Sequence, residues 1–329
     1  FIMPYFTKYG VALLSLVSLT KCKKNEPIPD TVLFDLTDSC DGVYIGIPSQ
    51  QFPQTIYSNN FIDWLHINPN NPNEFFYCGR DGMFNTKLYR LDRHTLTSTV
   101  LLDTITKFGN PQVNNNGHIL FYNEKNYHLW SINSNGDSLT KIIRAGWNCF
   151  WNFSGDKIIC TEADTITHEG TNIVFDINTK KRDTLAFSIN YGYDWQNEDN
   201  LFLSNSNYEP PIGFRIYDMG NKTSFTIPYL PYITKFGVEH LCWISKTEFL
   251  YSNDGYIKVF NLSSNLHTKL LKLCNNTEIQ SVSYSYKTNE VFVLLRKSEN
   301  IENSDAIFLS TTKIIVINLN TRLLSVINL

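Results

Sequence analysis

The residues with the clearest potential for chemistry are the pair Glu239-His240 and the carboxylates Asp194 and Asp63. Two carboxyl groups that face one another can act as general acid and general base on a glycosidic bond, and their separation sets the stereochemical outcome. Residues of these types at the start of a strand are more often solvated or hydrogen-bonded to a neighbouring loop. We therefore predict no catalytic residue, and we keep an enzyme that processes glycans or peptides as the alternative.

Other signatures of catalysis and of metal binding are absent from the sequence. The seven histidines are scattered, without the H-E-x-x-H spacing of a zinc site, and the cysteines form no C-x-x-C. The sequence contains no G-x-S-x-G, no phosphate-binding glycine loop and no D-x-D-x-D-G calcium loop. We predict neither a metal nor a cofactor.

The elements that would position functional residues recur along the chain. One short apolar segment of period two returns at 88–92, 129–133, 174–178, 216–220, 259–263 and 316–320, with intervals of 41, 45, 42, 43 and 57 residues. Roughly twenty to thirty residues before each copy stands a second signal, an anchor residue followed by a polar turn and an apolar run. Examples are WNFSGDKIIC from Trp151 and WISKTEFLYS from Trp243. The period of two predicts half-buried strands and excludes helices.

Each repeat supplies about four short strands over roughly forty residues, the size of one propeller blade. We predict an all-β fold, a six-bladed β-propeller of four-stranded antiparallel blades, with six repeats over residues 59–329. Residues 31–58 add strands that close the ring by pairing with the last blade, and a seventh, partial blade is the alternative. We expect a loop insertion over 296–312. The anchor residues Trp151, Trp195, Trp243 and Tyr284 fill the spaces between neighbouring sheets.

Two segments, WNFSGDKIIC at 151–160 and VNNNGHILFY at 113–122, resemble the W-S-P-D-G-K-x-I-A-F motif of TolB-type, WD40-like six-bladed propellers. The resemblance implies that fold over roughly residues 59–329. TolB carries an additional α/β domain before its propeller, and residues 31–58 are too few to form one. We therefore do not expect this protein to share the role of TolB in the Tol-Pal system.

The N-terminal segment indicates export. Residues 9–19 form an apolar run behind Lys8 that is too short to span a bilayer as a helix, as in the core of a signal peptide. Leu19-Thr20-Lys21-Cys22 and the polar residues after it resemble the lipobox and tether of bacterial lipoproteins, although Lys21 stands where a small residue is usual. The resemblance implies a signal peptide at 1–21, lipidation of Cys22, a tether at 22–30, and a propeller at 31–329. The protein would be a cell-envelope lipoprotein of unknown function, periplasmic or on the cell surface, held to the membrane by lipid alone, with secretion as the alternative.

Two cysteines are predicted to face one another. If Phe153–Asp156 is a four-residue hairpin loop, then Cys149 lies opposite Cys160 on the paired strand. A disulfide and a pair of buried free thiols are the two alternatives.

The innermost strands of a propeller start around the central channel, where loops commonly bind ligands. These starts bring aromatic and charged side chains together, which suits a carbohydrate or a peptide. The predicted ligand-binding residues are Trp64, Trp147, Tyr193, Asp194, Glu239 and His240. Because only 18% of residues are charged and the net charge is -3, we expect no nucleic-acid partner. We predict a non-catalytic binding or scaffold module for an envelope protein or glycan.

Overall fold

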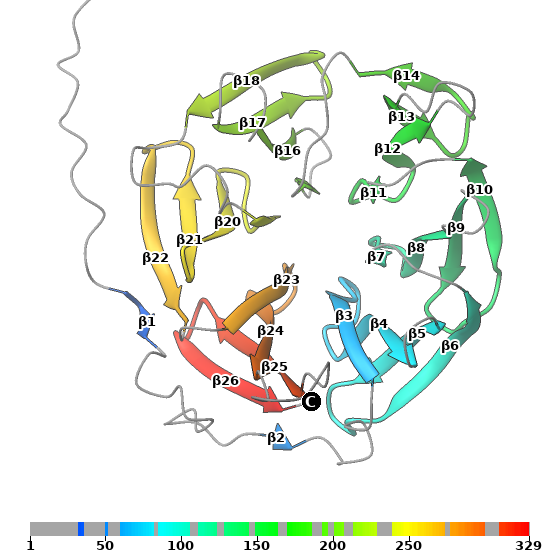
Figure 1. Ribbon diagram of the computed structural model, residues 1–329. Coiled ribbons are helices and arrows are strands. Elements are labelled where there is room, and N and C mark those ends of the chain that lie inside the picture. The colour runs from blue at the N-terminus through cyan, green and yellow to red at the C-terminus, as the bar shows by residue number, and fades with distance from the viewer. Residues whose placement is uncertain are drawn as a thin grey trace, which may run out of the picture.

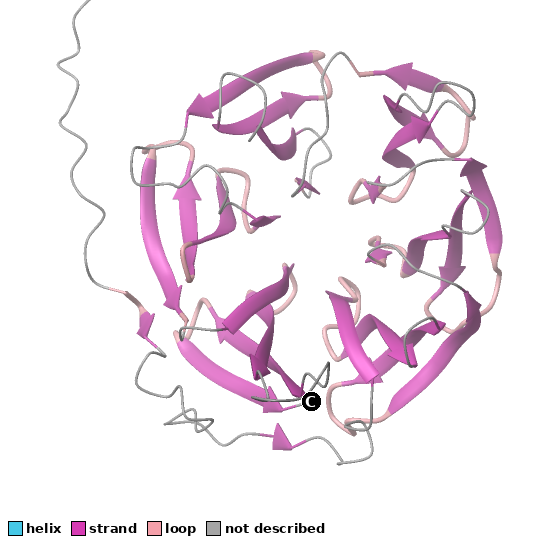
Figure 2. Cartoon of the chain, in the orientation of Figure 1, coloured by secondary structure: helices cyan, strands magenta, loops and turns pink. Residues whose placement is uncertain are grey.

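The computed structural model is built from strands (Figure 2). It describes residues 32–35, 50–51, 60–81, 85–105, 111–123, 128–144, 149–163, 170–185, 193–196, 201–206, 213–228, 239–273, 277–299 and 309–328. Within these ranges the chain forms strands β1–β26 and no helix. A helix long and apolar enough to cross a bilayer is accordingly not found in the described part of the chain.

Strands β3–β26 form six antiparallel sets of four consecutive strands each, which are the six predicted blades. Blade 1 contains β3 (Asn60–Ile67), β4 (Glu74–Asp81), β5 (Asn85–Asp92) and β6 (Ser98–Ile105), and blade 2 contains β7 (Gln112–Val113), β8 (His118–Asn123), β9 (His128–Asn133) and β10 (Thr140–Arg144). Blade 3 contains β11 (Phe150–Trp151), β12 (Lys157–Ala163), β13 (Gly170–Asp176) and β14 (Arg182–Thr184), and blade 4 contains β15 (Tyr193–Trp195), β16 (Leu201–Ser206), β17 (Gly213–Asp218) and β18 (Thr223–Pro228). Blade 5 contains β19 (Glu239–Trp243), β20 (Glu248–Asn253), β21 (Tyr256–Asn261) and β22 (Leu266–Lys272), and blade 6 contains β23 (Thr277–Ser285), β24 (Glu290–Glu299), β25 (Leu309–Asn318) and β26 (Leu323–Asn328).

The blades surround a central axis, with the first strand of each blade innermost (Figure 1). The prediction of a six-bladed propeller is confirmed. The recurring apolar segment of the sequence is the third strand of every blade. We call the end of the axis where the innermost strands begin the entry face. The opposite end, where the turns join the first strand of each blade to the second, is the turn face.

The core is divided into six clusters, one at each interface between neighbouring blades. Blade 5 illustrates the pattern: Trp243 and Phe249 pack on Phe214 of blade 4, and the Phe214 and Phe249 ring centroids are 4.9 Å apart. Trp151 and Trp195 likewise pack against the preceding blade. The predicted role of the tryptophan anchors is therefore confirmed, since a blade buries its faces only against its neighbours.

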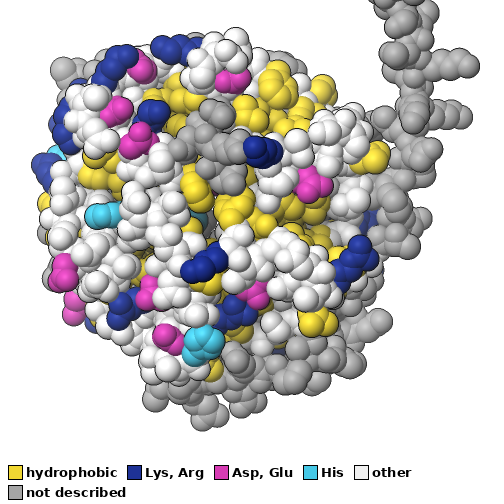
Figure 3. Space-filling model, turned by 180° about the vertical axis from the view of Figure 1, so that it is seen from behind, with side chains coloured by type: hydrophobic (Ala, Val, Ile, Leu, Met, Phe, Trp, Pro, Cys, Tyr) yellow, Lys and Arg dark blue, Asp and Glu magenta, His cyan; other side chains and the backbone are white. Residues whose placement is uncertain are grey.

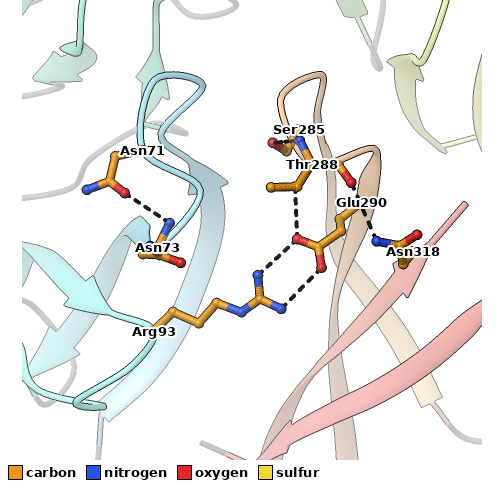
Figure 4. A network of polar contacts seen from close by, with 7 residues as sticks. All are labelled: Asn71, Asn73, Arg93, Ser285, Thr288, Glu290 and Asn318. Carbon is orange, nitrogen blue, oxygen red and sulfur yellow. Dashed lines mark hydrogen bonds and ion pairs between the residues drawn. The ribbon is translucent and has the colours of Figure 1, made fainter. Parts of the chain in front are cut away.

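The ring closes where blade 6 packs on blade 1. Phe75 and Phe292 meet edge to face with ring centroids 5.3 Å apart, inside a cluster shared by the two blades. The guanidinium of Arg93 reaches across this seam to Glu290 with two contacts, Nη1 to Oε2 at 2.9 Å and Nη2 to Oε1 at 3.3 Å (Figure 4). Thr288 donates a further hydrogen bond to Glu290. The first and last blades are thus joined by both apolar and ionic contacts.

Two short strands from the N-terminal part lie on the outer rim. β1 (Phe34–Asp35) runs parallel to β22 of blade 5, and β2 (Gln50–Gln51) runs parallel to β26 of blade 6. Each covers the outer edge of its blade, an edge whose backbone groups would otherwise be unpaired. Residues 1–31, which hold the predicted signal peptide, Cys22 and the tether, lie outside the described residues.

The hairpin of blade 3 has the predicted turn. Asn152 donates its backbone N–H to Lys157, and the register pairs Phe150 with Ile159, so the strand order brings Cys149 opposite Cys160. Both cysteines are buried free thiols joined by a hydrogen bond. Burial raises the pKa of the Cys149 thiol well above its usual value, and Cys160 adds to the rise. Of the two alternatives, the structure contains the reduced pair.

The expectation of a loop over 296–312 is wrong at both ends. β24 and β25 are each ten residues long, and Arg296 pairs with Thr312 and Glu299 with Leu309. This segment contains charged residues of the kind that are common in loops. They nevertheless extend the hairpin because β-branched Thr311 and Thr312 supply its second strand.

Candidate functional site

Five of the six predicted ligand-binding residues lie in the innermost strands of their blades. Trp64 lies in β3, Tyr193 in β15 and Glu239 in β19, and the structure describes their backbone but not their side chains. Trp147 lies outside the described residues. The contacts of the remaining two, Asp194 and His240, can be followed in detail.

Asp194 links blade 4 to blade 5. Its Oδ2 accepts the backbone N–H of Trp243 at 2.7 Å, and its Oδ1 accepts the backbone N–H of Trp195 at 2.9 Å. The thiol of Cys242 is a third hydrogen-bond partner. Both carboxylate oxygens are therefore engaged by fixed groups of the innermost strands.

Burial raises the pKa of Asp194 to about 7, although the backbone N–H groups of Trp243 and Trp195 favour the charged form and oppose the rise. The Tyr286 hydroxyl donates to the carbonyl of Trp243 at 3.0 Å. Burial raises the pKa of Tyr286 as well, and the nearby Asp194 and Cys242 raise it further. This part of the channel wall is a low-dielectric cluster that disfavours added negative charge.

A comparison with blade 2 indicates what the Asp194 carboxylate does. Gln112 stands at the equivalent place before its own anchor, and its Oε1 accepts the backbone N–H of Trp151 in the next blade at 3.2 Å. The neutral amide of Gln112 thus makes between blades 2 and 3 the same contact that Asp194 makes between blades 4 and 5. The contact needs an acceptor and does not need a titratable group.

His240 occupies an irregular position in β19. The register with β20 shifts between Glu239 and Cys242, and the φ of His240 is 51°, in the left-handed region. The ring donates a hydrogen bond to the backbone of Ile279 in blade 6. Burial lowers the pKa of His240 to about 4, so the ring is neutral near pH 7.

The same irregularity recurs in neighbouring blades. The register of β3 shifts between Asp63 and Leu65, and that of β23 shifts between Ile279 and Ser281. The hydroxyl of Ser281 accepts the backbone N–H of Leu65 at 3.2 Å. Blades 5, 6 and 1 are consecutive around the ring, and the innermost strand of each has an irregular register with the second strand. Bulges of this kind commonly redirect side chains next to binding sites.

The turn face is closed by contacts that the sequence did not indicate. The rings of Phe153 in blade 3 and Tyr286 in blade 6 meet edge to face with centroids 5.6 Å apart. Blades 3 and 6 lie on opposite sides of the ring (Figure 1). Two side chains from opposite blades can touch only at the axis, so these rings close the channel at this end.

Polar contacts join the turns of neighbouring blades around these two rings. Five of the six interfaces carry one: Asn70 Nδ2 to Asn115 O, Asn116 Nδ2 to Ser154 O, Gln196 Nε2 to Lys246 O, Tyr286 Oη to Trp243 O and Lys287 Nζ to Asn70 O. At the sixth interface, between blades 3 and 4, the turn residues 197–200 lie outside the described part. The many Asn residues in the turns are the sequence feature that could have indicated these polar contacts.

The described residues provide no obvious metal centre, since no three His, Cys, Asp or Glu side chains among them are grouped to hold an ion. Charges on the visible surface are mixed. On the face drawn in Figure 3, positive and negative side chains of the described residues are interspersed among uncharged ones.

No protein-family model matches the sequence, and no curated protein matches it either. Solved structures do share the fold. TolB from Acinetobacter baumannii is 12% identical, with a TM-score of 0.54 over 85% of this chain and 64% of that one. A gluconolactonase from Xanthomonas campestris is 9% identical, with a TM-score of 0.54 over 72% and 84% of the two chains. An auxiliary nutrient binding protein from Bacteroides thetaiotaomicron is 12% identical, with a TM-score of 0.51 over 70% and 66%.

The chain spans less than two thirds of the TolB chain that it matches. The three proteins bear names of different functions, and identities of this size establish the fold alone. The chain is therefore a six-bladed β-propeller whose structural neighbours include TolB, and its activity has to be argued from its own residues.

Proposed function

We propose that this protein is an extracytoplasmic lipoprotein whose propeller binds a protein or a glycan at the entry face without transforming it. The observation that carries the proposal is the closure of the opposite end of the channel by Phe153 and Tyr286. A ligand of the channel must then approach from the entry face. The predicted aromatic and charged residues Trp64, Glu239 and His240 belong to strands that begin there.

The contacts of Asp194 favour binding over catalysis. A general acid or base must exchange a proton with a substrate in hydrogen-bond reach. Both oxygens of Asp194 instead accept backbone N–H groups, and Gln112 makes the equivalent contact between blades 2 and 3. We assign Asp194 to holding two blades together, although its pKa of about 7 would suit a general base.

The place of β1 on the propeller sets how far the predicted anchor would lie from the described residues. β22 runs from the turn face to the entry face, and β1 is parallel to it, so the chain arrives at Phe34 from the side of the turn face. Val32 is ten positions after Cys22 in the chain. An extended chain covers at most about 3.6 Å per residue, so a lipid on Cys22 lies within about 36 Å of Val32. Because β1 pairs with the last residues of β22, at the entry end of that strand, a tether of this length would reach a membrane beside either face of the propeller.

The test uses the purified full chain against arrays of envelope glycans and peptides. Wild type is compared with the double variant Trp64→Ala, Glu239→Gln and with the control Lys246→Ala on the turn face. The proposal predicts a bound class of ligand that the double variant loses and the control keeps. Turnover of the bound ligand, or loss of binding in the control alone, would overturn it. Incorporation of labelled palmitate in wild type and not in Cys22→Ala tests the anchor separately.

A further inference from the structure

The outer edge of blade 4 differs from the other outer edges of the ring. β18 is the outermost strand of this blade (Figure 1), and it pairs with β17 over six residues without a register shift. Residues 223–228 of this strand carry no charge, and Phe225 in its middle is 50% exposed. Among the described residues no further strand pairs with β18. Its outward backbone groups therefore form an edge to which another strand can be added.

The other five blades protect their outer edges. β1 covers part of β22, and β2 covers part of β26. β6 and β10 both contain register shifts and an exposed charge, Asp103 in β6 and Lys141 in β10. β14 is three residues long and contains Arg182 and Asp183. Covering segments, bulges, charges and short length are devices that keep sheet edges from pairing, whereas β18 has only Pro228 at its last position.

The backbone of β18 is complementary to itself. Hydrogen-bonded and non-hydrogen-bonded pairs alternate along an antiparallel ladder. Pro228 has no N–H and lies opposite Gly213, which places it at a non-hydrogen-bonded position of the β17–β18 ladder. Counting back in steps of two, the backbone N–H and C=O groups of Thr226 and Ser224 point away from β17. An antiparallel β18 from a second copy can therefore pair its Thr226 with Ser224, and its Ser224 with Thr226.

Phe225 lies at the centre of this register. It would stand opposite Phe225 of the second copy as a non-hydrogen-bonded pair, in which the Cα atoms are about 4.5 Å apart and the side chains are close. Each exposed ring would then be covered by its copy. Because residues 223–227 are uncharged, the pairing brings no like charges together.

We propose that two copies of this protein associate through β18, so that blade 4 of one copy and blade 4 of the other form one continuous sheet. The inference is independent of the proposed ligand at the entry face. Because the two β18 strands are antiparallel, the entry ends of the two blades point in opposite directions along the joined sheet. A pairing of this length falls short of the roughly 1,000 Å² of a stable interface, so we expect a dissociation constant of roughly 10–100 µM.

The first experiment is sedimentation velocity of the purified full chain from about 1 to 300 µM, a range that brackets the expected dissociation constant. Wild type should change from monomer to dimer over this range. Phe225→Lys places two ammonium groups opposite one another and should weaken the association tenfold or more. The matched control is Val100→Lys on β6, the outermost strand of blade 1, where the side chain is 45% exposed. This control should dimerise as wild type does.

Cysteine substitutions test the register. Phe225→Cys would stand opposite itself with Cα atoms about 4.5 Å apart, within the range that a disulfide spans, so oxidised glutathione should produce a covalent dimer. Thr223→Cys lies on the same strand but would be roughly 13 Å from its copy, because each residue advances a strand by about 3.3 Å. It should give no more covalent dimer than wild type does.

Three results would overturn the inference: a monomer at every concentration, a dimer that Phe225→Lys leaves unchanged, or no covalent dimer from Phe225→Cys. Hydrogen exchange separates a second copy from a cover supplied by the same chain. The inference predicts that the amides of Ser224 and Thr226 exchange freely in dilute protein and become protected as the concentration rises. Protection of these amides in the dilute monomer would show that the edge is already covered, and would also refute the pairing.

Discussion

Breaking the Arg93–Glu290 pair should weaken the seam that closes the ring. The side chains are 20% and 13% exposed, and two N–H groups of one guanidinium meet both oxygens of one carboxylate. The guanidinium also lies 5.5 Å from the centroid of the Phe292 ring. Exposed ion pairs contribute about 0–1 kcal/mol, whereas hydrogen bonds to charged groups contribute about 1.5–3 kcal/mol each. For this largely buried bidentate pair we expect a coupling free energy of about 1.5–3 kcal/mol.

The assay is a double-mutant cycle with Arg93→Met, Glu290→Gln and the double variant, measured by urea unfolding. Each single variant should lose about 2–3 kcal/mol of unfolding free energy, because it leaves its partner without a counter-charge. The double variant should lose less than the sum of the two. The melting temperature of each single variant should fall by roughly 4–12 °C, given about 2–4 °C per kcal/mol for a large domain.

A solvent-exposed pair provides the matched control. Lys181 and Asp183 in blade 3 are 3.2 Å apart, with side chains 67% and 45% exposed. Their cycle should give no more than about 0.5 kcal/mol, and about 1 M salt should remove it while leaving most of the Arg93–Glu290 coupling. A coupling at Arg93–Glu290 no larger than the control would refute the reasoning that this pair holds the seam.

Three further predictions concern single positions. The pKa of Asp194 is raised from 3.8 to about 7. The stability that this shift contributes is full below about pH 4 and is lost as the pH rises to about 7. The unfolding free energy of wild type should therefore fall by up to about 4 kcal/mol over that range. Asp194→Asn should lack this fall, and a flat wild-type profile in urea titrations would contradict it. Gly155→Ala should destabilise the protein by about 2 kcal/mol more than Gly255→Ala in thermal melts. Both residues have positive φ, but an added Cβ would overlap the neighbouring blade at Gly155 and meet open space at Gly255. Cys149 and Cys160 should resist iodoacetamide in the folded protein and react in urea, whereas a native mass two hydrogens lower would reveal a disulfide.

Much of the fold was predictable because a blade is a local unit. The recurring third strand and the anchor with its polar turn are read from period and spacing, which depend on neighbours in sequence. The hairpin of blade 3, with Asn152 opposite Lys157, follows from the same local rules. The assignment over 296–312 failed because charged residues can extend a hairpin as readily as form a loop.

The functional site was less predictable, because its contacts join different blades. The meeting of Phe153 and Tyr286 at the axis depends on blades 3 and 6 being opposite, which no local pattern records. The partner of Asp194 is a backbone group 49 residues away, so its carboxylate could not be distinguished from a solvated one.

The most direct test of the central claim, that ligands bind at the entry face, is photo-crosslinking in intact cells. A photoreactive amino acid replaces Trp64 in β3, a strand that begins at the entry face, in one protein and Lys246 at the turn face in another, both in the full chain. The account predicts a discrete crosslinked product from position 64, identified by mass spectrometry, and no discrete protein or glycan product from position 246. A discrete protein or glycan product from position 246, with none from position 64, would contradict it.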